Sequence, residues 1–262
     1  MVGKAKYFTS LDLASGYHQM RIPVEDREKT AFRTPLGHYQ WKALVEGLTN
    51  APSTFQRLMN SLFEPYIGKF VAVYLDDILV FSSTQEEHYE HLRIVLDILY
   101  RAELYCKIKK CTFMAREVKF LGHIVDERGL RPDPDKVAVV KSWPVPSSVK
   151  ELRSFLGLCN YFRKFIRGYA HLVFPMTELL KTKKAIKPKR KSEELKAFMN
   201  PEAVQAFELM KEALCKAPVL AHYDPSKRIE LVCDASKVAI GAVLLQDGHP
   251  IAYESRKLTP AE

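Results

Sequence analysis

Two neighbouring carboxylates, Asp76 and Asp77, lie inside an otherwise apolar stretch, Phe70–Ser82. The flanking residues are mostly β-branched, aliphatic or aromatic, so the stretch predicts a hairpin with the acidic pair at its bend. Two like charges about 4 Å apart repel by roughly 4 kcal/mol at an effective dielectric of about 20. Either one carboxyl group is kept protonated or a cation neutralises the pair, and a divalent metal ion is the usual partner. A turn that simply uses two Asp residues is the structural alternative.

A third carboxylate, Asp12, lies near the end of the predicted strand Tyr7–Leu13. If this strand lies beside the hairpin in one sheet, the three carboxylates converge on one surface. Such a surface can hold two metal ions, one activating an attacking hydroxyl and both stabilising the charge of an in-line phosphoryl displacement. The spacing predicts phosphoryl-transfer chemistry and leaves polymerase and nuclease as alternatives.

Local patterns in the first half of the chain predict the elements that must position these carboxylates. Alternation and turn residues predict strands, and apolar residues at spacings of three and four predict helices. The elements are a hairpin of Thr30–Thr34 with His38–Leu44, a helix over Ala51–Phe63 capped by Thr49 or Asn50, the hairpin Phe70–Ser82 and a helix over Glu86–Glu103. On the last helix, His88 and His91 are interpreted as surface histidines because no pattern of further metal ligands accompanies them.

The second half of the chain predicts short strands followed by helices and a final group of strands. These are strands within Cys106–Leu130 that include Lys119–Val125, helices over Lys136–Trp143, from Ser147 or Ser148 to about Gly168, and over Pro201–Ala217, and strands over Ile229–Cys233, Ile240–Gln246 and Ile251–Ser255. The last two strands are joined by Asp247-Gly248, a hairpin turn. The basic run Lys181–Lys191 is interpreted as a solvated linker, with a phosphate contact or a localisation signal as alternatives.

The composition favours a polyanionic partner. Lys and Arg number 40 against 31 Asp and Glu, a formal net charge of +9, and 47% of the 262 residues are hydrophobic. Nucleic acid and an acidic membrane surface both fit this charge. No apolar run reaches the roughly 18 residues of a membrane span, and the N-terminus lacks the apolar core of a signal peptide. The five cysteines are scattered and odd in number, so we expect reduced thiols in an intracellular protein.

Both ends of the chain have the pattern of truncations. A predicted strand begins at Tyr7, almost at the start, and the chain stops at Glu262 directly after Leu258–Ala261, which has the pattern of a helix start. We therefore expect the chain to be a piece of a longer one.

Several motifs occur together and in order, and they resemble the motifs of one enzyme family. Tyr74–Asp77 (YLDD) resembles the YxDD box of reverse transcriptases. The accompanying boxes are Phe8–Tyr17 (FTSLDLASGY), Gly47–Gln56 (GLTNAPSTFQ), Phe120–His123 (FLGH) and Val149–Phe165 (VKELRSFLGLCNYFRKF). Together they resemble the polymerase of gypsy-type long-terminal-repeat retrotransposons. The tail, Leu231–Gln246 followed by Ser255–Glu262, resembles the opening of that family's ribonuclease H-like domain.

The resemblance implies catalytic roles for residues that match the motifs. Asp12, Asp76 and Asp77 would hold two Mg²⁺ ions, for which Mn²⁺ could substitute. Tyr17 matches the aromatic residue that excludes a ribose 2′-hydroxyl and so selects deoxynucleotides. A half-buried packing aromatic is the structural alternative for Tyr17.

The resemblance also implies contacts to the template and to the primer. Gln56 and the helix around it would support the template side of the site. Leu121, Gly122 and His123 match the primer grip, where backbone groups hold the primer end.

Further matches fall in the second half of the chain. Gly157 would let a helix of the thumb approach the minor groove of the duplex, with helix packing as its structural alternative. Arg153 and Tyr161 lie one helical turn on either side and would touch sugar and phosphate. Asp234 matches the first acidic residue of the ribonuclease H-like domain, and a capping or turn Asp is its structural alternative.

Three departures from the family pattern bear on activity. The family's polymerase begins well before Phe8, with fingers residues that hold the triphosphate. The family usually has Pro-Phe-Gly-Leu where this chain has Val45–Leu48, so Glu46 and Gly47 fall in the nucleotide-binding segment and the Glu46 carboxylate would repel a triphosphate. Ribonuclease H chemistry needs several acidic residues, of which only Asp234 precedes the end of the chain.

The predicted fold class is α+β, with a polymerase palm of antiparallel sheet backed by helices, a helical thumb and an incomplete ribonuclease H-like α/β domain. Residues 1–131 would form the palm with truncated fingers, and residues 132–180 a thumb-like helical region. Residues 181–200 would form a basic linker, and residues 201–262 the N-terminal part of the ribonuclease H-like domain.

The predicted function is that of an RNA-directed DNA polymerase, a reverse transcriptase, of a retrotransposon. Its partners would be an RNA template, a DNA primer or duplex, deoxynucleoside triphosphates and the rest of the Pol polyprotein, with no membrane. We hypothesise a fragment or decayed copy that is weak or inactive alone. The alternative is a non-catalytic nucleic-acid-binding or host-adopted protein. The expected location is intracellular, in a cytoplasmic retroelement particle, with the nucleus as the alternative.

Overall fold

The computed structural model describes residues 3–182, 199–259 and 262, which divide into two compact units. The first unit holds the described residues up to Leu121 together with Val125–Glu127, and the second holds Gly122–Ile124 and the described residues from Arg128 onward. Residues 183–198 of the predicted basic linker, and residues 260–261 of the predicted helix start, lie outside the described residues. The predicted four-part domain division stays a prediction.

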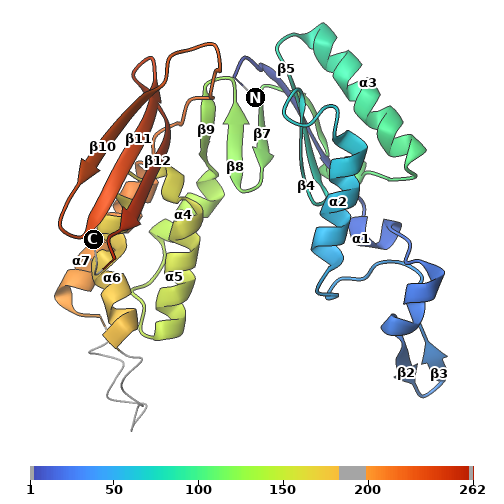
Figure 1. The fold of residues 1–262 in the computed structure, drawn as a ribbon, viewed down its shortest axis with the longest axis horizontal. Helices are drawn as coiled ribbons and strands as arrows, with labels where there is room; N and C mark the ends of the chain where they lie inside the picture. Colours follow the sequence, from blue (N-terminus) through green and yellow to red (C-terminus); the bar gives the residue numbers. More distant parts are fainter. Residues whose placement is uncertain (1–2, 183–198, 260–261) are drawn as a thin grey trace. The chain divides into compact units, whose positions relative to one another are not determined.

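An antiparallel sheet of four strands, in the order β4-β5-β1-β6, organises the first unit. Figure 1 labels its strands β4 and β5. Its strands are β1 (Tyr7–Asp12), β4 (Val71–Tyr74), β5 (Asp77–Ser82) and β6 (Thr112–Ala115). The predicted hairpin Phe70–Ser82 is confirmed as β4 and β5. Strand β1 pairs with β5 in the register that sets Asp12 opposite Asp77.

Two helices cover one face of this sheet. They are α2 (Ala51–Phe63), which matches its prediction residue for residue, and α3 (Gln85–Arg101). Alternate sheet residues, Leu11 of β1 and Ile78 and Val80 of β5, share a buried core with both helices. Because side chains alternate between the faces of a strand, Asp12 and Asp77 lie on the opposite face. A capping box at Thr84 and Glu87 begins α3.

The remaining elements of the first unit are short. They are α1 (Gly16–Gln19), a 3₁₀ segment over Val24–Thr30, the hairpin of β2 (Phe32–Thr34) and β3 (Gly37–Tyr39), a 3₁₀ segment over Ile108–Lys110, and β7 (Glu117–Phe120). The predicted hairpin around Pro35-Leu36-Gly37 is confirmed, with shorter strands than expected.

The interpretation of His88 and His91 as surface histidines is wrong. His88 is fully buried between the sheet and α3, with one ring nitrogen bonded to Thr9 Oγ1 at 2.7 Å and the other to Ser82 Oγ at 2.8 Å. His91 is half-buried and stacks on Phe70, with ring centroids 3.8 Å apart. Hydroxyl partners on two strands allow an imidazole to be buried, and one of them, Thr9, lies 79 positions from His88 in the sequence.

The prediction of one strand over Lys119–Val125 is also wrong. Strand β7 ends at Phe120, and β8 (His123–Asp126) begins after a two-residue turn. Both turn residues, Leu121 and Gly122, have positive φ, at 46° and 65°. This is the pattern of a type I′ hairpin turn, in which the chain reverses. The order of this sheet is β7-β8-β9, with β9 over Gly129–Pro132, and the division between the units falls within β8.

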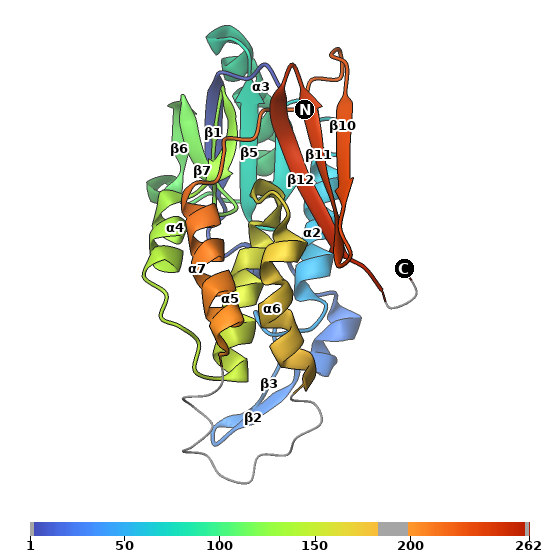
Figure 2. The ribbon, with the colours of Figure 1, turned by 90° about the vertical axis from the view of Figure 1, so that its left-hand side faces the viewer.

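Helices of the second unit share one apolar core. They are α4 (Pro134–Lys141), α5 (Val149–Tyr161), α6 (Tyr169–Thr182) and α7 (Pro201–Cys215). The predicted apolar stripe of α5 supplies Leu152, Phe155 and Cys159 to this core, which Phe207 of α7 also joins. The predicted helix to Gly168 ends earlier, at Tyr161, where a 3₁₀ turn over Arg163–Phe165 follows. Figure 2 shows α6 and α7 side by side.

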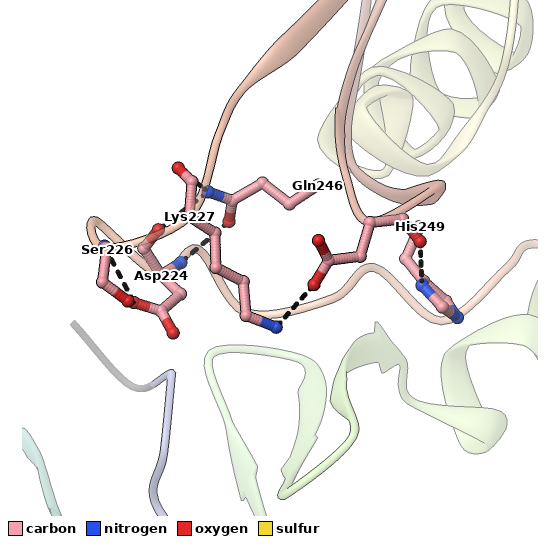
Figure 3. Close-up of polar contacts among 6 residues, drawn as sticks. Asp224, Ser226, Lys227, Gln246 and His249 are labelled. Carbon is pink, nitrogen blue, oxygen red and sulfur yellow. Dashed lines mark hydrogen bonds and ion pairs between the residues drawn. The ribbon is translucent and has the colours of Figure 1, made fainter.

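The second unit also contains an antiparallel sheet in the order β10-β11-β12 (Figure 2). Its strands are β10 (Glu230–Ala235), β11 (Ala239–Gln246) and β12 (His249–Lys257), which confirms the predicted final strands. Buried Gln246 accepts a hydrogen bond from the Asp224 N–H at 2.9 Å and donates to the carbonyl oxygens of Asp224 and Lys227 (Figure 3). In the part of the chain that the structure describes, no helix is long and apolar enough to cross a membrane.

Candidate active site

The three predicted catalytic carboxylates come from adjacent strands of the first unit. Asp12 ends β1, and Asp77 begins β5 directly opposite it in the antiparallel register. Asp76 occupies the turn between β4 and β5, and its carbonyl oxygen accepts a hydrogen bond from the Leu13 N–H at 3.1 Å. The structure therefore brings together the carboxylates that the sequence separates by more than sixty residues.

Electrostatic repulsion within this group is visible at Asp77. Burial is the largest cause that raises the pKa of the Asp77 carboxyl, and the negative charges of Asp76 and Asp12 raise it further. Lys110 acts in the opposite direction and lowers the pKa. Carboxylates that raise one another's pKa bind a cation favourably, because the cation offsets both their burial and their mutual repulsion.

Lys110 is a site residue that the sequence reasoning missed. Its Nζ lies 3.2 Å from Asp12 Oδ2, and the Asp12 side chain is only 22% exposed. The neighbouring Lys107 N–H donates to the carbonyl oxygen of Asp12 at 2.8 Å. The available signal was topological: a strand that follows Lys110 and pairs antiparallel with β1 brings Lys110 to the end of β1 that carries Asp12.

The turn that carries Asp76 is strained. Tyr74 and Asp77 form the closing pair, and Leu75 has a φ of 53° at the first turn position. Positive φ at this position alone is the pattern of a type II′ turn, in which Gly is the usual residue. Holding a bulky side chain there costs of order 1–3 kcal/mol, and such strain is concentrated at functional sites.

Gln56 contacts this turn through its side-chain amide. Its Oε1 accepts a hydrogen bond from the Leu75 N–H at 2.6 Å, and its Nε2 lies 3.4 Å from the Val73 carbonyl oxygen. Gln56 is therefore part of the catalytic turn's environment, while the contact to a template that the family resemblance implies stays a prediction.

Tyr17 lies beside the acidic turn. Burial raises the pKa of its hydroxyl, and the negative charges of Asp76 and Glu46 raise it further. Its ring packs on Phe55 of α2, with centroids 5.3 Å apart. The Tyr17 side chain therefore both packs against α2 and lies next to the carboxylates.

Gly16 is a second residue that the sequence reasoning missed. A Cβ atom at this position would come within 3.0 Å of Phe55 Cζ and 3.2 Å of Asp76 Cβ. Since Phe55 is fully buried, it has little room to give way. The absence of a side chain at Gly16 lets α1 approach the acidic turn closely enough to place Tyr17 there.

Glu46 and Gly47 form an exposed bend near Tyr17. The charge of Glu46 acts on the Tyr17 hydroxyl, so this carboxylate faces the neighbourhood of the site. Gly47 has a φ of 102°, which a residue with a side chain rarely adopts. The bend thus depends on Gly47 for its shape and carries a negative charge from Glu46.

The carboxylates fit a divalent cation by chemistry. Asp12, Asp76 and Asp77 offer hard oxygen ligands that repel one another without a cation. Within residues 3–182, 199–259 and 262, no three His, Cys, Asp or Glu side chains are arranged around a common metal position. The Asp12 carboxylate forms an ion pair with Lys110.

The predicted primer-grip residues surround the β7–β8 turn. His123 is buried, and its ring lies 5.3 Å from the Tyr161 ring and 5.5 Å from the Phe165 ring. A Cβ atom on Gly122 would lie 3.5 Å from the Tyr161 ring. The second unit therefore brings Gly122, His123 and Tyr161 together, as sequence spacing alone could not predict.

Gly157 has open space where a side chain would be. It is exposed on α5, and a Cβ atom there would meet nothing within 4 Å beyond its chain neighbours and the backbone of its own helix. Within the described chain this contradicts helix packing as the reason for Gly157. Arg153 is exposed one turn earlier on the same helix.

Asp234 lies on β10, paired with Gly241 of β11 and exposed. It lines a cavity of about 330 Å³ together with Arg167, His171 and Ser255. Within the described residues, Asp234 is not joined by two further metal-ligating side chains. In the first unit, by contrast, adjacent strands set Asp12 opposite Asp77.

Two segments match family models. Residues 2–125 match the family described as reverse transcriptase (RNA-dependent DNA polymerase), and residues 199–262 match an RNase H-like domain found in reverse transcriptase. The first match includes Asp12, Asp76 and Asp77, and the second includes Asp234.

Curated relatives match along the whole chain. The retrovirus-related Pol polyproteins from transposons 297 and gypsy of Drosophila melanogaster are 43% and 39% identical over 100% of this chain. The transposon Tf2-3 polyprotein of Schizosaccharomyces pombe is 38% identical over 97%. The chain spans only 24%, 25% and 19% of the length of these relatives.

Solved structures are similar over nearly the whole chain. The foamy viral protease-reverse transcriptase in complex with double-stranded DNA has a TM-score of 0.84 and 27% identity, covering 99% of this chain and 44% of that one. A second structure of that protein, in complex with an RNA/DNA hybrid, has a TM-score of 0.81 and 27% identity over 97% of this chain and 34% of that one. The predicted α+β polymerase fold is confirmed by this similarity.

Proposed function

Because the chain belongs to the reverse transcriptase family of retrotransposon Pol polyproteins, we propose that it catalyses RNA-directed DNA synthesis. In this reaction the 3′-hydroxyl of a primer attacks the α-phosphorus of a deoxynucleoside triphosphate. A new phosphorus–oxygen bond forms to the primer, the bond to the leaving oxygen breaks, and pyrophosphate departs. The observation that carries the proposal is the antiparallel register that sets Asp12 opposite Asp77, with Asp76 in the adjoining turn.

Asp12, Asp76 and Asp77 are the residues that would hold two Mg²⁺ ions, with Mn²⁺ as a substitute. When bound, such ions lower the pKa of an attacking hydroxyl and neutralise charge on the transferred phosphoryl group. The raised pKa of Asp77 supports this role, because a carboxyl group crowded by other carboxylates gains most from a cation. Lys110 holds the Asp12 carboxylate and adds a positive charge to a site that accepts an anionic substrate.

Tyr17, Glu46 and Gly47 would form one side of the nucleotide position. The Tyr17 ring is fixed by its packing on Phe55, so it would present a rigid edge to the sugar and exclude a 2′-hydroxyl. The Glu46 charge lies close enough to act on the Tyr17 hydroxyl, and it would disfavour a triphosphate there.

Contacts to primer and template complete the proposal. Leu121, Gly122 and His123 would hold the primer end through the reversed backbone of the β7–β8 turn. Gly157 leaves an open surface on α5 that a duplex minor groove could approach. The foamy viral relative was solved with double-stranded DNA and with an RNA/DNA hybrid, and this supports the same two nucleic acids as partners here.

The setting of this activity is also part of the proposal. The chain would act within a longer Pol polyprotein, because the relatives that it matches are polyproteins about four to five times its length. Its location would be intracellular, in a cytoplasmic retroelement particle, with the nucleus as the alternative.

Primer extension by the purified chain tests the proposal. The assay supplies an RNA template, a DNA primer and deoxynucleoside triphosphates with Mg²⁺, and repeats the reaction with Mn²⁺. We expect weak extension that is lost in Asp76→Asn and kept in Asp234→Asn, with all three proteins folded. Robust extension would refute the hypothesis that the chain is weak or inactive alone.

The opposite outcome supports the second interpretation. If primer–template binding survives Asp76→Asn while no protein extends the primer with either metal, the chain is a non-catalytic nucleic-acid-binding or host-adopted protein. Metal-dependent RNA cleavage that is lost in Asp12→Asn would instead support a nuclease.

A further inference from the structure

The turn between β4 and β5 is held in its strained conformation from two sides. On one side, the Leu13 N–H donates to the Asp76 carbonyl oxygen at 3.1 Å. On the other side, the Leu75 N–H donates to Gln56 Oε1 at 2.6 Å. A strained backbone persists only where its surroundings hold it, so these contacts account for the positive φ of Leu75.

The Gln56 amide can meet the turn in only one orientation. A backbone N–H only donates, so the group that faces Leu75 has to be the carbonyl oxygen of the amide. The amide nitrogen is then directed at two acceptors, Asn60 Oδ1 at 2.7 Å and the Val73 carbonyl oxygen at 3.4 Å. Asn60 lies one helical turn further along α2, and its side-chain amide can present its oxygen to this nitrogen.

The helix that carries Gln56 is itself fixed. Phe55 and Met59, which lie beside Gln56 along α2, are fully buried in the core of the first unit. A side chain whose amide is hydrogen-bonded at both ends, on a packed helix, is the kind of support that keeps a site within a fraction of an ångström of its working geometry.

We propose that Gln56 is a positioning residue, which holds the Leu75–Asp76 turn in its strained conformation and so fixes the Asp76 carboxylate for nucleotidyl transfer. The catalytic part of this inference rests on the proposed function. Gln56 touches neither the primer nor the nucleotide in this role; it acts through the backbone of the turn.

The first test measures the turn directly and needs no catalysis. Hydrogen exchange of the Leu75 amide is compared between the parent chain, Gln56→Met and Gln205→Met, a matched control on the exposed face of α7. We expect exchange at Leu75 to be about tenfold faster in Gln56→Met only, because a hydrogen bond to a partly buried amide is lost. Unchanged exchange would overturn the inference whether or not the chain is a polymerase.

The second test separates positioning from binding. In single-nucleotide incorporation, we expect Gln56→Met to lower kcat by roughly 10- to 100-fold with less than about a threefold change in the KM for nucleotide, since a small misplacement of a reacting group has this cost. Gln56→Glu keeps an acceptor for the Leu75 N–H and should retain more of the activity than Gln56→Met.

A rescue experiment identifies the strain as the reason. Gly adopts positive φ without steric cost, so Leu75→Gly should restore most of the kcat that Gln56→Met loses. A Gln56→Met variant that keeps full kcat, or a loss that Leu75→Gly leaves unchanged, contradicts the inference. If the parent chain shows no polymerisation, the proposed function fails while the exchange experiment still decides whether Gln56 holds the turn.

Discussion

The β4–β5 hairpin of the first unit and the β11–β12 hairpin of the second are both closed by two-residue turns, yet the two turns differ in chemistry. The β11–β12 turn is Asp247-Gly248, with φ of 50° and 74°, which is a residue pair well suited to a type I′ turn. The β4–β5 turn places Leu75 at a φ of 53°, where Gly would be the usual residue. The β11–β12 turn has residues that adopt its backbone conformation without strain, whereas the β4–β5 turn is held in a strained conformation by neighbouring residues.

Glutamine side chains support both regions, but Gln246 holds a loop of the fold whereas Gln56 holds a turn of the candidate active site. Buried Gln246 bonds the backbone of Asp224 and Lys227 and so holds the loop that leads into β10 (Figure 3). Gln56 bonds the Leu75 N–H directly beside Asp76. Of these two hairpins, the one that aims carboxylates keeps a strained backbone and the one that only closes a sheet avoids it. Leu121 of the β7–β8 turn, where the primer grip is predicted, also has a positive φ.

The largest expected effect is a loss of unfolding free energy of the first unit at acid pH. Burial, followed by the charge of His91, lowers the pKa of His88 from 6.5 to about 4. Between these pH values the unfolded chain binds more protons at His88 than the folded chain does. The contribution of His88 to the free energy of unfolding is therefore fully present above pH 6.5, and about 3 kcal/mol of it is lost as the pH drops to about 4. Urea unfolding at several pH values measures this, with Trp41 as the reporter after Trp143→Phe.

Matched variants show whether His88 is responsible. In His88→Leu most of this pH dependence should disappear, even though the variant is less stable at pH 7. The exposed His38→Gln should keep it. A pH dependence that is unchanged in His88→Leu would show that other groups cause it.

The next effect in size falls on the second unit. Gln246→Met removes three hydrogen bonds to the backbone of the loop at Asp224 and Lys227. We expect a loss of roughly 1–3 kcal/mol in the unfolding free energy of this unit, followed by Trp143 fluorescence after Trp41→Phe. The kcat of nucleotide incorporation should stay unchanged, in contrast to Gln56→Met. A large fall in kcat for the stably folded Gln246→Met protein would erase the difference between the two regions.

The smallest predicted effect concerns nucleotide affinity. Glu46→Gln removes a negative charge near Tyr17 and should lower the KM for deoxynucleoside triphosphate about three- to tenfold at low salt, with kcat unchanged. The gain should shrink as salt is added. Glu64→Gln, an exposed change just after α2, is the control. An unchanged KM in Glu46→Gln would place the triphosphate away from this carboxylate.

Elements with local signals could be predicted from the sequence. Helix Ala51–Phe63 and the turn Asp247-Gly248 follow from apolar spacing and turn residues that lie next to one another in the chain. Helix α6 was missed because Pro175 interrupts its pattern, and the β7–β8 turn was missed because Leu121-Gly122 lies inside an apolar run.

Site residues that depend on distant contacts could not be predicted in the same way. Lys110 reaches Asp12 across 98 positions, and Thr9 bonds His88 across 79. Gly16 matters because Phe55 and Asp76 close over it, which no local pattern reveals. The carboxylates can be predicted because like charges in an apolar strand are unusual by themselves. The residues that contact them carry no such local signal, because their role depends on contacts formed only in the fold.

Manganese binding tests the central claim most directly. Electron paramagnetic resonance counts the Mn²⁺ ions bound by the chain with primer–template and a non-hydrolysable nucleotide. We predict two bound ions in the parent protein, and loss of both in the folded double variant Asp12→Asn, Asp77→Asn. An equal count in the two proteins would contradict a metal site built from these carboxylates.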